Sequence, residues 1–326
     1  METVSTADHK KIEDTPFRPR RLGHANIFVS NYEKAFEFYN AVAGFEEVYR
    51  QPDNKASFVS NGNTYHDYGL TDIHSRYAKP GQKPGLFHFA FELKNEADLV
   101  DGYRQAVKTG VEIQSTEDHD VAHSLYKFDP DGNAVEYYAD VVPDWRSARR
   151  GIIIKSKPKY VPGETSQPLS DEFYPKDPEI RVVKNALFHS KKVAHVALMT
   201  KDYEGMHDYY TGFAGLVPFI GGRNSDFVVL RGTHASQDLT LYRNLEGTEP
   251  GLHHIGMEVW DESNLNEAVH QLQERKIALV ADVNHSARHA VTILDPDNIR
   301  LQFFVNRKWE PTELEGLDFS TALKLL

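Results

Sequence analysis

An internal duplication is the feature that most restricts how this 326-residue chain can fold. The stretch RLGHANIFVSNYEKAFEFYNAVAGFEEV, which begins at Arg21, returns as KVAHVALMTKDYEGMHDYYTGFAGLVPF, which begins at Lys192. His24 pairs with His195 at an offset of 171 residues (195 − 24). A later block, GLFHFAFEL, returns as GLHHIGMEV at an offset of 166 (254 − 88, for the histidine in fourth place). Such a repeat predicts two modules that share one fold.

Each copy is also doubled inside. A strand-like run that ends in a polar turn precedes a helical stretch, whose apolar face contains Ala35, Phe36, Tyr39 and Val42. Shorter alternating strands follow, and the block HFAFELKNEADLVDGYRQAVKTGVE then starts the same order again. We therefore predict an α+β fold of four βαβββ units, two in each module.

The repeats divide the chain into segments. We expect a flexible leader over residues 1–20, a first module over 21–142, a linker over 143–190, a second module over 191–310 and a tail over 311–326. The leader is polar and lacks the apolar stretch of a signal peptide. The linker is rich in Pro, Lys and Ser and is long for a structureless connection, which favours a functional lid or a strap across the modules. The tail favours a short helix over a neighbouring surface.

Composition excludes several classes of function. The net charge is −11 and no basic tract is present, so we expect no nucleic-acid partner. Cysteine is absent, which rules out a thiol nucleophile and a zinc–thiolate site. No apolar run approaches the length of a membrane span, so we expect no membrane partner and a cytoplasmic location.

Three residues of the first module are of metal-ligand type and stand at matching places of the repeated unit. His24 lies on the opening strand, His88 on the strand that opens the second unit, and Glu136 on the strand after the DPDG turn. The internal symmetry should bring them together in one cleft. Two imidazoles and one carboxylate suit Fe(II) or Mn(II) and leave positions open for catalysis. The simpler interpretation is that both histidines are ordinary strand residues capped by backbone groups.

These residues, with the motifs around them, resemble the vicinal oxygen chelate superfamily, and in particular its two-module extradiol ring-cleaving dioxygenases. The resemblance covers roughly residues 20–310. The C-terminal signature of that family stands here as HDVAHSLYKFDPDGNAVE, from His119 through Tyr126 to Glu136. The context of the family's acid–base histidine stands as YHDYGL, which supplies His66, and Asn26 follows the first ligand by two residues.

The resemblance implies a role for each of these residues. His24, His88 and Glu136 would bind Fe(II), with Mn(II) as the alternative, and a catechol-type diol and dioxygen would be the substrates. His66 would be the acid–base catalyst, since the unperturbed pKa of histidine lies near neutrality. Tyr126 and His119 would hydrogen-bond the substrate oxygens, with His123 as an alternative to His119, and Asn26 would be a pocket residue. The family also implies a homodimer or a homotetramer.

The second module departs from this pattern. It keeps His195 and His254 but replaces three residues: Gln237 stands for His66, Thr292 for Tyr126 and Gln302 for Glu136. A neutral amide is a poor substitute for a carboxylate on a hard divalent ion. We therefore predict a structural second module, while a weak second metal site stays open. In the best-known relatives the C-terminal module holds the metal, so the order here is inverted.

Two other functions are compatible with the same scaffold. One is a redox-neutral, glyoxalase-like isomerase, lyase or thiol transferase, which uses its metal as a Lewis acid. The other is a binder similar to the antibiotic-sequestering members of the superfamily, which need no metal triad. The retained triad and His66 favour the dioxygenase. The sequence leaves open the ring substrate, the position of cleavage and the choice between Fe(II) and Mn(II).

Overall fold

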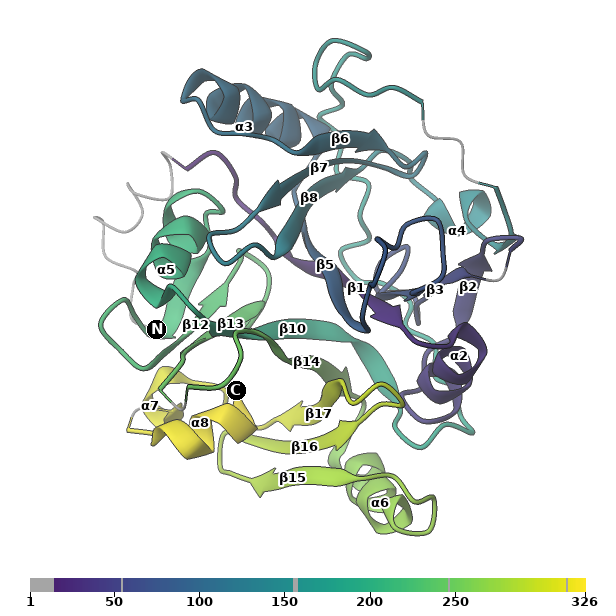
Figure 1. Cartoon of the computed structure of the whole chain (residues 1–326), viewed down its shortest axis with the longest axis vertical. Coiled ribbons are helices and arrows are strands. Elements are labelled where there is room, and N and C mark those ends of the chain that lie inside the picture. Colours follow the sequence, from purple (N-terminus) through teal and green to yellow (C-terminus); the bar gives the residue numbers. More distant parts are fainter. Residues whose placement is uncertain (1–14, 54, 155–157, 246, 315) are drawn as a thin grey trace.

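The computed structural model describes residues 15–53, 55–154, 158–245, 247–314 and 316–326. It contains two large mixed sheets, one from each half of the chain (Figure 1). The first has the strand order β6-β7-β8-β5-β1-β4-β3-β2-β9, and the second has the order β11-β12-β13-β10-β14-β17-β16-β15. The two orders are related by the duplication, apart from the short edge strand β9.

The first half contains two βαβββ units. The first unit is β1 (Arg21–Val29), α2 (Tyr32–Ala41), β2 (Glu47–Arg50), β3 (Ala56–Val59) and β4 (Tyr68–Asp72). The second unit is β5 (Gly85–Glu92), α3 (Glu96–Lys108), β6 (Ser115–Asp118), β7 (Ala122–Phe128) and β8 (Ala134–Asp140). In each unit the first strand pairs in parallel with the last, and β1 pairs antiparallel with β5 to join the units.

The second half repeats this order. Its third unit is β10 (Ser190–Thr200), α5 (Tyr203–Gly212), β11 (Val217–Gly221), β12 (Phe227–Arg231) and β13 (Leu239–Arg243). Its fourth unit is β14 (Gly251–Val259), α6 (Glu262–Leu272), β15 (Leu279–Asn284), β16 (Arg288–Leu294) and β17 (Arg300–Asn306). The predicted α+β fold of four βαβββ units is therefore confirmed.

The four long helices begin in the same way. The side chains of Asn31, Asn95, Asp202 and Asp261 each accept a hydrogen bond from the backbone N–H three residues later. Such N-caps satisfy donors that have no partner within the helix, and each stabilises its helix by about 1 kcal/mol. The local sequence thus sets where each helix begins after its opening strand.

Strand alternation gives each sheet two different faces. On β1, the side chains of Ala25, Ile27 and Val29 belong to one large core that also contains residues of the second module. His24 and Asn26 alternate with them and therefore lie on the other face of the sheet. The shared core lies between the modules, whereas the candidate site lies on the face that is turned away from it.

Two buried carboxylates connect the modules through backbone hydrogen bonds. Asp67 Oδ1 accepts from the N–H of Val193 at 3.2 Å, and Asp238 Oδ1 accepts from the N–H of Leu22 at 2.6 Å. Asp67 and Asp238 are related by the offset of 171 (238 − 67). An aspartate of each module therefore accepts a hydrogen bond from the opening strand of the other module, β1 or β10.

The DPD turns make a second symmetric pair of contacts. The Tyr39 hydroxyl donates to Asp295 Oδ2 at 3.2 Å, and the Tyr210 hydroxyl donates to Asp129 Oδ2 at 2.8 Å. Asp129 and Asp295 are the first residues of the two DPD turns. The motif shared by both copies thus serves the contact between modules. We call these four hydrogen bonds, which Asp67, Asp238, Asp129 and Asp295 accept, the clasp contacts.

The expected leader differs from the structure at its end. Residues 1–14 lie outside the described residues, but Phe17 is only 1 % exposed and stacks on Tyr137 with ring centroids 4.4 Å apart. The chain is therefore packed before residue 20. An apolar residue among prolines and arginines did not indicate this, because its partner lies on a strand more than a hundred residues away.

The linker packs against the first module. It forms α4 (Trp145–Ala148) and β9 (Gly151–Ile152), which pairs with β2. Further on, the carbonyl oxygen of Tyr160 accepts from Thr116 Oγ1 at 2.6 Å, and the Tyr160 hydroxyl donates to Glu96 at 3.2 Å. These contacts hold the linker against the first module, and a role as a lid or as a strap across the modules stays a prediction.

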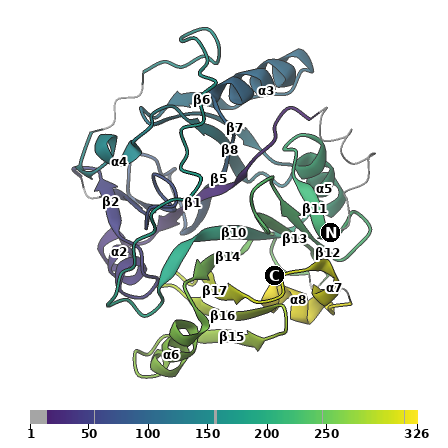
Figure 2. The ribbon, with the colours of Figure 1, turned by 180° about the vertical axis from the view of Figure 1, so that it is seen from behind.

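The tail forms α7 (Pro311–Leu314) and α8 (Phe319–Leu325). Both views place α8 against the second sheet (Figures 1 and 2). Leu325 and Leu326 are fully buried in a cluster with Ala197, Tyr242 and Phe304, on the face of the sheet that in the first module carries the candidate site. Within the described part of the chain, no helix has the length and apolarity needed to cross a membrane.

Candidate metal centre

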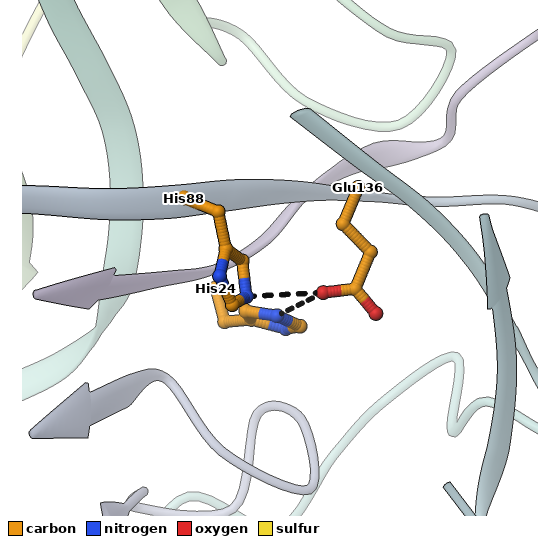
Figure 3. Close-up of side chains that lie close together, drawn as sticks. All are labelled: His24, His88 and Glu136. Carbon is orange, nitrogen blue, oxygen red and sulfur yellow. Dashed lines mark hydrogen bonds and ion pairs between the residues drawn. The ribbon is translucent and has the colours of Figure 1, made fainter. Parts of the chain in front are cut away.

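Three adjacent strands bring His24, His88 and Glu136 together. They lie on β1, β5 and β8, which neighbour one another in the sheet, and both His24 and Glu136 are paired with Ala90 of β5 in the strand register. Their side chains converge on one point (Figure 3). Glu136 Oε2 lies 3.0 Å from His24 Nε2 and 3.2 Å from His88 Nε2. The predicted convergence of these residues in one place is therefore present in the fold.

The three donor atoms fit a single divalent ion. They lie within 4.8 Å of one another, and the side chains are at most 8 % exposed. Among the described residues this is the one group of three such side chains that could hold a metal. Three protein ligands of this kind would leave further coordination positions of a divalent ion free, as in catalytic rather than structural sites.

Glu136 is held as an acceptor by its surroundings. Burial alone would raise its pKa, but the charges of His24 and His88 and their hydrogen bonds outweigh burial and hold the pKa of Glu136 well below its usual range. Its other oxygen, Oε1, accepts from Ser124 Oγ at 2.5 Å. The carboxylate is thus ionised and oriented before any ion arrives.

Asn26 lies beside the centre, where it was expected as a pocket residue. Its Nδ2 is 3.0 Å from His88 Nε2. The absence of a side chain at Gly69 makes this possible, because a Cβ there would lie 2.2 Å from Asn26 Oδ1. In the second module the corresponding residues are Ala197 and Thr240, so the large and small positions are exchanged.

His66 is in the pocket and packs directly on a ligand. Its ring centroid lies 3.9 Å from that of His24, with the planes inclined by 33°. It is 3 % exposed and also contacts Phe58 and Tyr65, with ring centroids 5.0 Å and 4.5 Å away. It precedes β4, the neighbour of β1, so the sheet places it next to the metal ligands.

Tyr126 and His119 lie together on the other side of the centre. The Tyr126 hydroxyl is 3.0 Å from His119 Nε2, and Tyr126 pairs with Glu136 across β7 and β8. Burial, and then the charge of Glu136, raise the pKa of Tyr126 well above its usual value, so its hydroxyl stays protonated. His123, the alternative to His119, instead contacts Glu96 at 2.6 Å and lies against the ring of Tyr160, with ring centroids 4.1 Å apart. His119, and not His123, lines the pocket.

A cavity of about 260 Å³ opens above these residues. Its walls are largely aromatic and come from the first module and its loops: Phe58, Tyr65, Tyr77, Phe87, Tyr126 and Phe128. The metal-ligand residues, Asn26 and His66 line the same cavity. Such a pocket suits a flat apolar ring that presents polar atoms at one edge.

The equivalent place in the second module is filled by the protein itself. His195 Nε2 and His254 Nε2 lie 3.1 Å apart, and burial lowers the pKa of both histidines well below the usual value, assisted by the nearby Arg288. Arg288 donates to Gln237 Oε1 at 2.7 Å and lies 3.5 Å from Gln302 Oε1. A guanidinium thus occupies the region where the first module gathers its metal ligands.

The tail completes this closure. Arg288 also donates to the carbonyl oxygen of Leu325 at 3.1 Å, and Gln302 Nε2 donates to that of Lys324 at 3.1 Å. Gln237 Nε2 donates to the carbonyl oxygen of Leu326. The amides that replace a histidine and a glutamate therefore bind α8 rather than an ion.

Sequence reasoning missed Ser124, Gly69 and Arg288. One signal was available in the alignment of the two copies. Ser124 corresponds to Ala290 (290 − 124 = 166), so the serine is lost in the copy that also loses the glutamate. Arg288 corresponds to Ala122 by the same offset, so the first module has no arginine at this position.

Comparisons with known proteins agree with this geometry. The sequence profile of the glyoxalase/bleomycin resistance protein/dioxygenase superfamily matches residues 21–137, which contain all three metal-ligand residues. The fold and the site define a metal-binding protein built from tandem βαβββ units. Residues 21–137 therefore match this superfamily, which is also called the vicinal oxygen chelate superfamily, and the second half of the chain repeats the same order of elements.

Particular relatives are dioxygenases by name. The chain is 26 % identical over 243 residues to catechol-2,3-dioxygenase of Bacillus subtilis (strain 168), covering 73 % of this chain and 74 % of that one. It is 22 % identical over 323 residues to the manganese-dependent 2,3-dihydroxybiphenyl 1,2-dioxygenase of Geobacillus genomosp. 3, covering 93 % and 92 %. A solved variant of homoprotocatechuate 2,3-dioxygenase from Brevibacterium fuscum has the same fold, with a TM-score of 0.65 and 15 % identity over 90 % of this chain and 73 % of that one.

Proposed function

We propose that this protein is a metal-dependent extradiol dioxygenase that inserts both atoms of O2 into a catechol-type aromatic diol, in the breakdown of aromatic compounds. The observation that carries the proposal is the buried group of His24, His88 and Glu136 in the lining of a pocket that also contains six Phe and Tyr side chains. The names of the relatives support the same activity.

The metal-ligand residues fit Fe(II), which we propose as the ion, with Mn(II) as the alternative. Both accept two imidazoles and a carboxylate, and the name of one relative specifies manganese. When bound, such an ion supplies neighbouring open positions for the diol and for dioxygen and lets electron density pass between them. No other cofactor is required for this chemistry.

The side chains around the centre would handle the substrate and its protons. His66 would take a proton from the diol hydroxyl and return it during ring opening, because it lies against His24 and a histidine can do both near neutral pH. The Tyr126 hydroxyl and His119 Nε2, which lie 3.0 Å apart, would hydrogen-bond the substrate oxygens. Asn26 would orient the substrate edge beside His88. Phe58 and Phe87 would hold the ring and exclude water.

The test is anaerobic reconstitution with Fe(II), or in parallel with Mn(II), followed by air and a panel of catechols. We expect a yellow ring-opened product with one O2 consumed per product. A protein that retains one ion per chain but consumes no oxygen with any diol would instead support the redox-neutral isomerase, lyase or transferase. A protein that retains no ion would support a binder. Cytoplasmic location and the homodimer or homotetramer stay predictions.

A further inference from the structure

A buried arginine of the linker holds the backbone of a pocket residue. Arg149 follows α4 and is 1 % exposed. Its Nη2 donates to the carbonyl oxygen of His119 and, at 3.0 Å, to Asp120 Oδ2. His119 lies 30 residues earlier, in the turn between β6 and β7. The guanidinium therefore reaches from the linker to the peptide unit that carries a proposed substrate contact.

The turn that receives this contact has an unusual backbone. Asp120 has a φ of 63°, and the Val121 N–H donates to the carbonyl oxygen of His119 at 2.8 Å. A hydrogen bond between residues two apart around a positive φ is a γ-turn, which is a strained conformation. Such strain persists only where the surroundings hold it, and it is common at functional sites. Arg149 is part of those surroundings.

Arg149 itself is firmly placed. Its backbone N–H donates to the carbonyl oxygen of Trp145 at 2.8 Å, and its guanidinium lies 5.3 Å from the ring centroid of Tyr49. The linker also contacts the same hairpin from Tyr160, whose carbonyl oxygen accepts from Thr116 on β6. The hairpin is thus held by the linker at its turn and along its edge strand.

The direction of the His119 imidazole depends on this peptide unit. Its Nε2 lies 3.0 Å from the Tyr126 hydroxyl and 3.9 Å from Glu136 Oε1. A rotation of the turn would carry the ring away from both. Because a misplacement of about 1 Å can cost on the order of 10²-fold in rate, a group that fixes the turn affects turnover without touching the substrate.

We propose that Arg149 is a positioning residue, which keeps His119 directed into the pocket through the His119 carbonyl. The role of His119 in turnover rests on the proposed function. The second module offers a matched contact without a catalytic site: Arg307 Nη1 donates at 2.8 Å to the carbonyl oxygen of His285, the residue that corresponds to His119 (285 − 119 = 166). Arg307→Ala is therefore a control for loss of an arginine clamp as such.

The test compares Arg149→Ala in the full chain and in a His119→Ala background, with metal content measured for each. We expect a loss of about 10- to 100-fold in kcat/KM for Arg149→Ala with unchanged metal content, and no further loss when His119 is already alanine. Arg307→Ala should leave kcat/KM unchanged. An equal loss from Arg149→Ala in both backgrounds would overturn the proposal, because the arginine would then act independently of His119.

A second readout does not depend on turnover. In metal-free protein with 15N-labelled histidine, the His119 signal is assigned by its loss in His119→Gln. We expect Arg149→Ala to shift the imidazole signal of His119 but not that of His285, and Arg307→Ala to do the reverse. If Arg149→Ala does not fold, Arg149→Lys serves in its place, and a smaller shift is expected. An unmoved His119 signal contradicts the proposal even if the protein proves to cleave no diol.

Discussion

Ser124 and Glu136 form a pair whose members are replaced together in the second module, by Ala290 and Gln302. The serine hydroxyl donates to Glu136 Oε1, so Oε2 is the oxygen directed at His24 and His88. In the second module the Gln302 amide oxygen instead lies near Arg288, and its Nε2 donates to the carbonyl oxygen of Lys324 in α8. These contacts do not require a serine donor at position 290. At the scale of single residues, the ability to hold a metal depends on the partner of the carboxylate as well as on the carboxylate.

Replacing this partner should weaken the metal site without unfolding it. For Ser124→Ala we expect metal affinity to fall about 10- to 100-fold, the usual effect of losing a hydrogen bond to a ligand. Competition with a chromogenic chelator measures it. Ala290→Ser, the reciprocal change in the second module, is the control and should leave the affinity unchanged. Equal affinity of Ser124→Ala and the parent protein would mean that the serine does not orient the carboxylate.

His66 should affect turnover and not metal retention. For His66→Gln, which copies Gln237, we expect one ion per chain to be retained and kcat to fall about 10²- to 10⁴-fold, since a positioned acid–base group contributes in that range. Metal analysis and oxygen uptake on the same sample measure both quantities. Unchanged turnover would remove His66 as the acid–base group.

The residue scale also shows where sequence reasoning stops. His24, His88 and Glu136 could be predicted because they stand at matching places of a repeat. Gly69 and Arg149 could not, because their roles depend on which side chain or turn approaches them in space. Ser124 is intermediate, since its replacement together with Glu136 is visible when the two copies are aligned.

The two modules differ most in what covers the same face of their sheets. In the first module this face lines a cavity of about 260 Å³. In the second it is covered by the tail, and Leu325 and Leu326 are buried in a cluster that includes residues of β10, β13, β16 and β17. The tail therefore occupies, in the second module, the place that the pocket occupies in the first.

Weakening this element should reduce stability and leave the metal centre alone. Leu325→Ala removes a fully buried side chain, so we expect the free energy of unfolding to fall by about 2–5 kcal/mol. Urea unfolding measures it. Lys324→Ala changes an exposed side chain of the same helix and should have little effect. Unaltered stability of Leu325→Ala would indicate that α8 is not bound there in solution.

For helices and strands, the sequence predicts which elements form better than it predicts the surfaces against which they pack. The order of strands and helices could be predicted because it is repeated, and the tail was expected to be helical. Its target could not be predicted, because α8 is short and the surface that receives it is assembled from strands far apart in the chain. The buried start of the first module, at Phe17, was missed for the same reason.

On the scale of the whole molecule, the clasp contacts make the two modules one unit. Each of the buried carboxylates Asp67 and Asp238 accepts a backbone N–H from the other module, and the two DPD turns accept tyrosine hydroxyls in the same reciprocal manner. Burial raises the pKa of Asp67 and that of Asp238 to about 6, although hydrogen bonds partly offset it. The modules thus meet at two carboxylates that are costly to ionise.

These two groups predict a distinctive pH dependence of stability. Because the folded protein binds their protons more tightly than the unfolded chain, they stabilise the fold increasingly as pH falls from about 6 towards 4, and this contribution is lost as pH rises through about 6. Relative to Asp67→Asn, the parent protein should gain on the order of 2–3 kcal/mol of unfolding free energy between pH 7 and pH 4. Chemical unfolding at several pH values measures it. A constant difference across this range would mean that Asp67 titrates normally.

Two consecutive residues, His66 and Asp67, point to opposite faces of the first sheet. His66 lies in the pocket, and the next residue, Asp67, joins the modules. In the second copy the histidine has become Gln237 while the aspartate remains as Asp238. After a duplication, the residues on the pocket face of one copy can therefore change while the residues that join the two modules stay the same. Two adjacent residues thus follow different rules: the first differs between the copies, and the second, which joins the modules, is the same in both.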